Sequence, residues 1–305
     1  MKKVIAFIPA YNEEDCIGKV INTVQSKYPK SKTEHNGYFL EILVVNDGST
    51  DRTEQIIKQK KVTIVSHSMN RGLGAATRTA MKKCYDLDAD ICIKLDADFQ
   101  HDPDDIEKTI MPILNNETDI CWGSRFKGKI NYKMPLERYI GNKFFTFLMN
   151  RLTNYKISDA QTGLMAFNKT YIAKFEIIGN YNPPQQLLID ASKKGMRYYE
   201  VPVVFHKRTT GKSFVNFKYP FFVLVNILRI LTMANPIKVF GTLGILGISL
   251  SVLHSVLSHL SKSNNLEMPA FILDETFRLA LWIISIQCFF FGLLADLVIQ
   301  IKSKN

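Results

Sequence analysis

Short apolar runs recur through the first part of the chain, and each run ends in polar residues that favour turns. They cover residues 4–8, 42–45, 62–65 and 91–95 and are rich in Val and Ile. Stretches with helical character separate them. This alternation predicts βαβ units and a mostly parallel sheet with helices on both faces. Ligands of such sheets bind beyond the carboxyl ends of the strands, where the polar motifs of this sequence fall.

Two longer apolar runs, residues 236–260 and 277–301, lie in the last part of the chain. Each would form a helix about 37 Å long, which exceeds the roughly 30 Å hydrocarbon core of a bilayer. We therefore expect a two-helix transmembrane hairpin. Small residues in the first run allow close packing, either within the hairpin or between copies in a homo-oligomer: Gly241, Gly244, Gly247 and Ser251.

The orientation of the hairpin follows from charges at its ends. Lys238, Lys302 and Lys304 flank the outer ends of the pair, whereas the connecting loop contains acidic residues. Positively charged flanks mark the cytoplasmic side of a membrane. We therefore expect a multi-pass protein of the cell membrane whose N-terminal domain is cytoplasmic.

The segment between the two parts is less regular. Residues 214–233 are apolar, but Lys218, Pro220, Asn226 and Arg229 interrupt them. No uninterrupted stretch reaches spanning length, so we predict an interfacial helix, with a third, tilted span as the alternative. The predicted organisation is a catalytic domain over residues 1–213, the interfacial helix over 214–235 and the hairpin over 236–305.

Composition narrows the classes of partner. The formal net charge is +11, and nine Lys and Arg residues against one acid, Glu200, lie between residues 193 and 238. A basic collar at that place would contact anionic lipid headgroups, which makes nucleic acid the weaker interpretation. The five cysteines show no CxxC spacing, which argues against a zinc site or a disulfide framework and favours a reducing compartment.

The strongest local signal for chemistry follows the fourth apolar run. Asp96, Asp98 and Gln100 alternate there with other residues. Carboxylate and amide oxygens are hard ligands that suit Mg²⁺ or Mn²⁺, which keep coordination positions for diphosphate oxygens. The alternative is an acidic turn that contacts only water.

The other strand ends are polar as well. Tyr11 follows the first run and can stack on a nucleobase, and Asp47 follows the second and can accept from a base or ribose donor. Helix capping by residues 49–51 is the alternative. The third run leads to residues 70–76, whose GxG pair, Gly72 and Gly74, also occurs in nicotinamide-cofactor sites. That fingerprint belongs after the first strand of its unit, so we interpret the loop as lying close to a nucleotide.

Taken in order, these motifs resemble glycosyltransferase family 2 with the GT-A fold, and specifically the polyprenyl-phosphate sugar synthases such as the dolichol-phosphate mannose synthases. The matching segments span the predicted catalytic domain: IPAYNEE at 8–14, VVNDGSTD at 44–51, NRGLGAA at 70–76, LDADFQHDP at 95–103, GSR at 123–125, DAQTG at 159–163 and EVPVVFHKRTTGKS at 200–213.

The resemblance implies roles for individual residues. It implies binding of a nucleotide sugar by Pro9, Tyr11, Glu13, Asp47, Arg71, Asp96, Ala97 and Asp98. It implies binding of Mg²⁺ or Mn²⁺ by Asp96, Asp98 and Gln100. It implies contact with the acceptor phosphate by Arg125, Arg138, Arg208 and Lys212, with Asp98 and the three arginines as the catalytic residues. Arginine offers a planar donor fork to phosphate, although any one of them could instead form a surface ion pair.

The sequence departs from the family pattern at a few positions. Met165 stands where an arginine is usual, and Gln186 where many members have Glu. Gly141 and Asn142 replace a serine-containing stretch of the mannose synthases. These departures leave the donor sugar and the shape of the acceptor pocket open.

The implied activity is inverting transfer of a sugar from a nucleoside-diphosphate sugar to dolichyl or another polyprenyl phosphate at a lipid bilayer. The lipid-linked sugar would serve protein or envelope glycosylation. We favour UDP-GlcNAc or UDP-glucose over GDP-mannose as donor. A processive polysaccharide synthase is an alternative, but its usual later Glu-Asp pair and Gln-x-x-Arg-Trp motif do not occur here. A non-catalytic membrane partner of a glycosylation enzyme is another.

Overall fold

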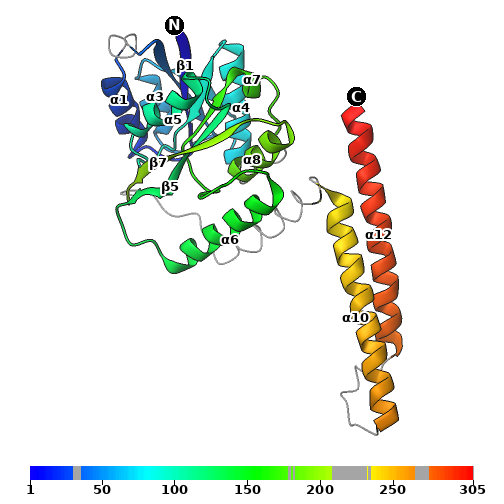
Figure 1. Cartoon of the computed structure of the whole chain (residues 1–305). Coiled ribbons are helices and arrows are strands. Elements are labelled where there is room, and N and C mark those ends of the chain that lie inside the picture. Colours follow the sequence, from blue (N-terminus) through cyan, green and yellow to red (C-terminus); the bar gives the residue numbers. More distant parts are fainter. Residues whose placement is uncertain are drawn as a thin grey trace. The chain divides into compact units, whose positions relative to one another are not determined.

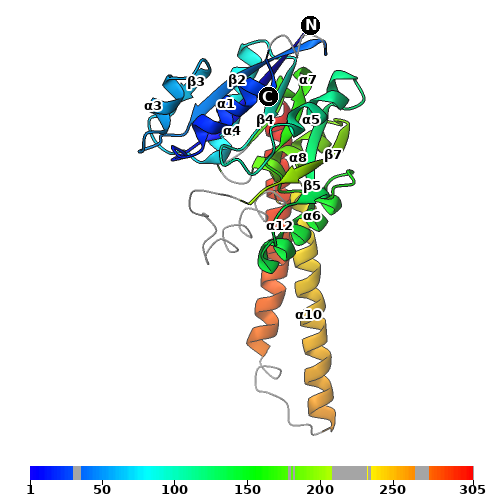
Figure 2. The same cartoon turned by 90° about the vertical axis from the view of Figure 1, so that its left-hand side faces the viewer.

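The computed structural model describes residues 1–29, 36–177, 180, 183–207, 232, 235–264 and 275–304. The chain forms two compact units, Met1–Phe214 and Val215–Asn305, shown in Figures 1 and 2. Each is described by itself. Almost all of the predicted interfacial helix, residues 214–235, lies outside the described residues, as do Arg208 and Lys212.

The described residues of the first unit form a seven-stranded sheet with the order β3-β2-β1-β4-β6-β5-β7. The strands are β1 (Lys2–Ala10), β2 (Tyr38–Asn46), β3 (Thr63–Ser66), β4 (Ile91–Lys94), β5 (Ile120–Ile130), β6 (Met165–Asn168) and β7 (Tyr198–Phe205). β1 runs parallel to β2 and β4, β2 to β3, and β5 to β7. Only β6 runs antiparallel to its neighbours. The predicted mostly parallel α/β sheet is confirmed.

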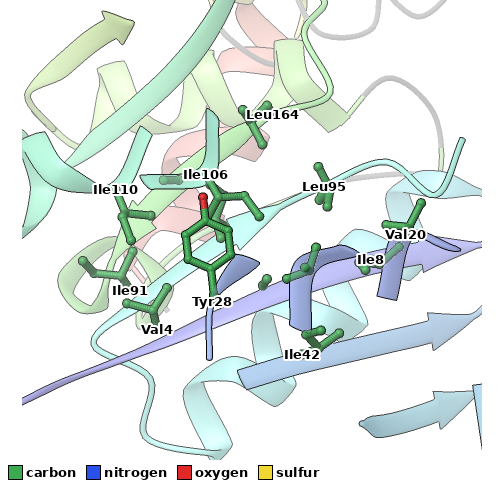
Figure 3. Packing of buried hydrophobic residues seen from close by; sticks show 14 of the residues in the cluster. Val4, Ile8, Val20, Tyr28, Ile42, Ile91, Leu95, Ile106, Ile110 and Leu164 are labelled. Atoms are coloured by element: carbon green, nitrogen blue, oxygen red, sulfur yellow. The ribbon is translucent and has the colours of Figure 1, made fainter. Parts of the chain in front are cut away.

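Helices cover both faces of this sheet. They are α1 (Ile17–Lys27), α3 (Thr53–Lys58), α4 (Leu73–Asp86), α5 (Asp105–Leu114), α6 (Leu136–Leu152), α7 (Lys169–Ile172) and α8 (Pro183–Lys193). Alternate strand residues such as Val4 and Ile8 pack with the apolar faces of α1 and α5 (Figure 3). Successive strand residues point to opposite faces, so Ile5 and Phe7, which are also buried, lie on the other face.

The second unit contains two long helices, α10 (Pro236–Asn264) and α12 (Glu275–Lys304), which lie side by side in Figures 1 and 2. Pro236–Ser261 and Glu275–Ile301 are long and apolar enough to cross a membrane. Between the helices the packing is close: a side chain at Gly244 would meet the Phe289 ring at 2.7 Å. The small residues of α10 therefore serve the hairpin itself, and a homo-oligomer stays a prediction.

A β-bulge interrupts the pairing of β5 with β7. Ser124 pairs with Pro202 and Lys129 with Val204, so residues 125–128 of β5 face Val203 alone. A Cβ atom at Gly128 would collide with the backbone of Val203. Bulges redirect side chains and are frequent beside active sites. Here the bulge contains Arg125, so its geometry fixes where that side chain points.

We expect Gly128→Ala to lower the free energy of unfolding of the first unit by about 1–3 kcal/mol, because the backbone of β7 has to move away. Gly141→Ala is the matched control, since a Cβ atom there meets nothing within 4 Å. In helix α6 this control should be neutral or stabilising by up to about 1 kcal/mol. Chemical denaturation followed by near-ultraviolet circular dichroism measures both, and equal stability of the two variants would contradict the bulge argument.

Candidate active site

The Asp96 to Gln100 turn directly follows β4, at the carboxyl edge of the sheet. Leu95 still donates its N–H to the Phe7 carbonyl of β1, which anchors the turn beside that strand. Phe99 has a φ of 62°, a left-handed conformation that is strained for a bulky residue. The Gln100 N–H donates to Asp98 Oδ1 at 3.1 Å. The turn is therefore held in one shape by its own hydrogen bond and by the neighbouring strand.

Asp96 is held from two sides. The Lys94 ammonium forms an ion pair with Asp96 Oδ1 and donates to the Gly163 carbonyl at 3.2 Å. Burial opposes the charged carboxylate, but the positive charge of Lys94 keeps the pKa of Asp96 below its ordinary value. On the other side, a Cβ atom at Gly163 would collide with Asp96 Oδ2. Only glycine therefore fits at residue 163 while the carboxylate keeps this position.

His101 follows this turn and also contacts Gly163. Its imidazole is buried, and Nε2 accepts the Gly163 N–H at 3.2 Å, which assigns the proton to Nδ1. Burial lowers the pKa of His101 to about 4, against the attraction of Asp96, so the ring is neutral at physiological pH. In the described part of the chain, Nδ1 has no hydrogen-bond partner. Sequence reasoning missed both His101 and Lys94.

Asp47 is buried and fastens the glycine loop to the end of β2. It accepts the backbone N–H groups of Arg71 at 3.0 Å and Gly72 at 2.8 Å. His67 lies 2.6 Å from Asp47 Oδ1 through Nδ1 and 2.9 Å from the Thr79 hydroxyl through Nε2. The predicted nucleotide contact of Asp47 would therefore come from a carboxylate that the protein already holds in place.

The loops after β1 and β2 are joined by side chains. Asn12 donates its N–H to the Ser49 hydroxyl at 3.0 Å and accepts the Thr50 N–H at 2.8 Å. The Glu13 N–H donates to the Thr53 hydroxyl at 2.8 Å. Ser49 and Thr50 thus connect the two loops, in addition to any capping function. The predicted nucleotide residues differ in exposure: Tyr11 and Glu13 are partly exposed and Arg71 is exposed, whereas Pro9 and Ala97 are buried.

Arg125 lies in a buried ion pair. Its Nε and Nη2 atoms donate to the two oxygens of Asp159 at 2.6 and 2.7 Å, and Nη2 also donates to the Gln161 carbonyl at 3.0 Å. Burial opposes both charges, but the pairing lowers the pKa of Asp159 and raises that of Arg125. Within the described ranges no acceptor lies within hydrogen-bond distance of Arg125 Nη1. A phosphate contact by Arg125 would have to use that atom.

A second buried carboxylate supports this pair. Glu200 accepts the Ser158 N–H and hydroxyl at 2.9 and 2.7 Å, and the Tyr198 hydroxyl at 2.7 Å. The Lys127 ammonium lies 3.0 Å away. Glu200 thereby fixes the chain immediately before Asp159, which leads on to Gly163.

Of the four residues predicted to contact the acceptor phosphate, the structure describes Arg125 and Arg138. Arg138 lies on the exposed side of α6, and its Nη1 donates to the Tyr132 hydroxyl at 3.4 Å. Gln100 is buried, and its side-chain nitrogen donates to the His206 carbonyl at 3.3 Å, so the end of β7 reaches the Asp96 to Gln100 turn. Arg208 and Lys212 follow His206 in the sequence but lie outside the described residues.

The side chains present fit a Mg²⁺ or Mn²⁺ ion that shares its ligands with a substrate. Among the described residues there is no group of three or more His, Cys, Asp or Glu that could hold a metal ion. Asp96 and Asp98 are nevertheless partly exposed at the strand end. Two carboxylates and an amide are hard oxygen donors, and Mg²⁺ commonly completes its coordination with water and substrate phosphates.

Comparison with known proteins identifies relatives of this chain by sequence. A sequence profile described as Glycosyl transferase family 2 matches residues 5–175. The chain is 36% identical over 223 residues to the UDP-N-acetylglucosamine–dolichyl-phosphate N-acetylglucosaminyltransferase of Methanococcus voltae, covering 66% of this chain and 85% of that protein. It is 28% identical over 258 residues to the dolichol-phosphate mannosyltransferase of Pyrococcus furiosus, covering 81% and 69%.

The fold also occurs in a solved structure. Glucosyl-3-phosphoglycerate synthase from Mycobacterium tuberculosis, in complex with Mn²⁺, UDP and glucosyl-3-phosphoglycerate, has a TM-score of 0.59 at 17% identity and covers 76% of this chain and 80% of its own. This likeness concerns the fold alone. The sequence relatives confirm the resemblance to polyprenyl-phosphate sugar synthases. The profile matches more than half of the chain, including the Asp96 to Gln100 turn and the Arg125–Asp159 pair, and the relative from Methanococcus voltae is matched over most of its length. The chain therefore belongs to glycosyl transferase family 2.

Proposed function

We propose that this protein transfers a sugar from a nucleoside-diphosphate sugar to the phosphate of a polyprenyl phosphate at the cytoplasmic face of the cell membrane. The observation that carries the proposal is the Asp96 and Asp98 pair, fixed at the carboxyl edge of the sheet in a family 2 chain that also has a two-helix apolar hairpin. The names of the relatives, which act on dolichyl phosphates, support the acceptor class.

A UDP-sugar is the proposed donor, with UDP-GlcNAc first. The relative from Methanococcus voltae is named for UDP-N-acetylglucosamine, and it matches at higher identity than the mannosyltransferase from Pyrococcus furiosus. Tyr11, Glu13 and Arg71 are accessible beside the loops that Asp47 and Asn12 hold together. These residues are the proposed contacts to the nucleotide.

The proposed reaction is a single in-line displacement with inversion. An oxygen of the acceptor phosphate forms a bond to the anomeric carbon while the bond from that carbon to the donor diphosphate breaks. A phosphate monoester is already largely ionised at pH 7, so a strong general base is not needed. Asp96, Asp98 and Gln100 would hold a Mg²⁺ or Mn²⁺ ion that neutralises the departing diphosphate. The proposed contacts to the acceptor phosphate are Arg125, through Nη1, and Arg138, Arg208 and Lys212.

Helix α6 supports a position at the membrane, because large apolar side chains are exposed along it. Its buried face combines Phe145 and Met149 with Asn142 and Thr146, and the latter two bond to Asp159 at 3.4 Å and to the Ala160 N–H at 3.2 Å, respectively. Its exposed side carries an apolar stripe whose members follow helical spacing: Leu136, Ile140, Phe144 and Phe147, with exposed fractions of 70%, 57%, 55% and 59%. A contiguous apolar stripe of this kind fits the interface of a bilayer.

Basic residues border the same stripe. The Lys143 ammonium lies 4.4 Å from the centre of the Phe126 ring, and the Arg151 guanidinium lies 5.5 Å from that of Phe147. Cations beside an apolar face suit a surface of anionic headgroups. Sequence reasoning placed the interfacial element in residues 214–235. Helix α6, which belongs to the first unit, is a further proposed contact with the membrane interface.

The first test is a transfer assay with a short-chain polyprenyl phosphate, Mn²⁺ or Mg²⁺ and radiolabelled UDP-GlcNAc, UDP-glucose and GDP-mannose. We expect a labelled, mild-acid-labile lipid from UDP-GlcNAc, and at least a 100-fold lower rate for Asp98→Asn, because a metal-bound diphosphate is lost. Asp88→Asn is the matched control, since Asp88 forms an exposed ion pair with Lys169. No transfer from any donor, although nucleotide binds, would refute the proposed acceptor.

The outward face of α6 can be tested separately. We expect the double variant Ile140→Ser and Phe144→Ser to fold normally, because both side chains are exposed. Its kcat/KM for a long-chain polyprenyl phosphate in vesicles should fall about tenfold, whereas its rate with a short-chain acceptor in detergent should change little. Tyr85→Ser on α4, also exposed, is the control. Equal losses with both acceptors would contradict a membrane contact.

A further inference from the structure

Lys94 is an unusual residue for the end of a central strand. β4 is buried along its whole length, and the Lys94 side chain is 1% exposed. Within the described part of the chain, its ammonium has two partners, Asp96 Oδ1 and the Gly163 carbonyl. A buried ammonium is costly unless it is paired, so Lys94 and Asp96 depend on each other.

This pairing fixes the carboxylate of Asp96. Lys94 holds Oδ1, and the backbone at Gly163 packs against Oδ2 without room for a Cβ atom. About one third of the Asp96 side chain remains exposed. The carboxylate therefore faces the site with a counter-ion already bound behind it.

The charge of the site is correspondingly small before any substrate binds. Asp96 and Asp98 contribute two negative charges, and Lys94 cancels one of them. Arg125 adds no net charge because Asp159 neutralises it at 2.6 Å. These five side chains together carry one net negative charge. The same lysine attracts a nucleoside diphosphate, which supplies the missing negative charge. In a water-poor interior such charges act over several ångströms.

We propose that Lys94 is a positioning residue that holds Asp96 and, as its built-in counter-ion, disfavours the free cation while favouring the nucleotide diphosphate. The site then takes up Mg²⁺ or Mn²⁺ together with the nucleotide rather than before it. This inference rests on the proposed function of Asp96 and Asp98 in binding the cation. It predicts opposite effects of Lys94 on the two ligands, which a purely structural role would not produce.

The test measures each ligand alone on the full-length protein in detergent. We expect Lys94→Met to bind Mn²⁺ at least about tenfold more tightly than wild type without nucleotide, as followed by the paramagnetic resonance signal of free Mn²⁺. With EDTA present, the same variant should bind UDP or GDP more weakly in calorimetry. Lys94→Gln, which keeps a donor for Asp96 and Gly163 but loses the charge, should shift both affinities in the same directions.

Lys108→Met is the control, because Lys108 is an exposed lysine that forms an ion pair with Asp105 at 2.7 Å on α5. It should leave both affinities unchanged. Suppose that both Lys94 variants bind Mn²⁺ no more tightly than wild type, while Asp98→Asn abolishes Mn²⁺ binding. That result would overturn the proposed role of Lys94 and leave the metal assignment standing. Equal Mn²⁺ binding by wild type and Asp98→Asn, with or without UDP or GDP, would overturn the metal assignment in the proposed function.

Discussion

The buried carboxylate of Asp159 is the interaction on which the geometry of the candidate site depends. Its two oxygens accept the side chain and the backbone N–H of Arg125 on the β5 bulge, and it also accepts the Gln161 N–H. An unpaired Arg125 or Asp159 would be a buried charge, so neither can leave without the other. Glu200 holds the chain just before Asp159 from β7. These contacts hold the start of the segment that leads to Gly163, and Gly163 packs against Asp96. The Arg125–Asp159 pair thus supports, together with Lys94, the position of the Asp96 carboxylate.

The sequence predicted the half of the fold whose signals are local. Alternating apolar runs identified β1 to β4, because each is buried and bounded by turn residues. The hairpin was equally visible, since helices long enough to span a bilayer need long apolar runs. β5 to β7 were missed. β5 ends in exposed residues, and β6 is short and runs antiparallel. Both strands form because they pair with segments that are distant in the sequence, and a local pattern of apolar residues does not indicate such pairing.

The location of the candidate site could be predicted, because its motifs directly follow the predicted strands. The acidic turn after β4 and the polar ends of β1 and β2 lie where the pattern placed them. The hydrogen bonds and ion pairs that each side chain forms within the protein were not predictable. Arg125 was expected to contact phosphate. The structure pairs its Nε and Nη2 atoms with Asp159, and a phosphate contact through Nη1 stays a prediction. Lys94 offered one signal that could have been read: it ends an otherwise apolar strand two residues before Asp96, and a lysine there must find a carboxylate. Helix α6 was not predicted, because both its buried and its exposed positions mix apolar and polar side chains, so no amphipathic pattern marks it.

The two sides of the site are built in different ways, and this difference has a functional meaning. On the proposed donor side, loops are joined by backbone donors to Asp47 and by the Asn12 contacts, so the protein itself holds the residues proposed to contact the nucleotide. On the proposed acceptor side, Arg138 lies on an exposed face of α6 beside an exposed apolar stripe. A polyprenyl phosphate is itself a charged head on an apolar chain. A surface that leaves both kinds of contact open suits a substrate that stays in the bilayer, whereas a preorganised loop suits one that arrives from water.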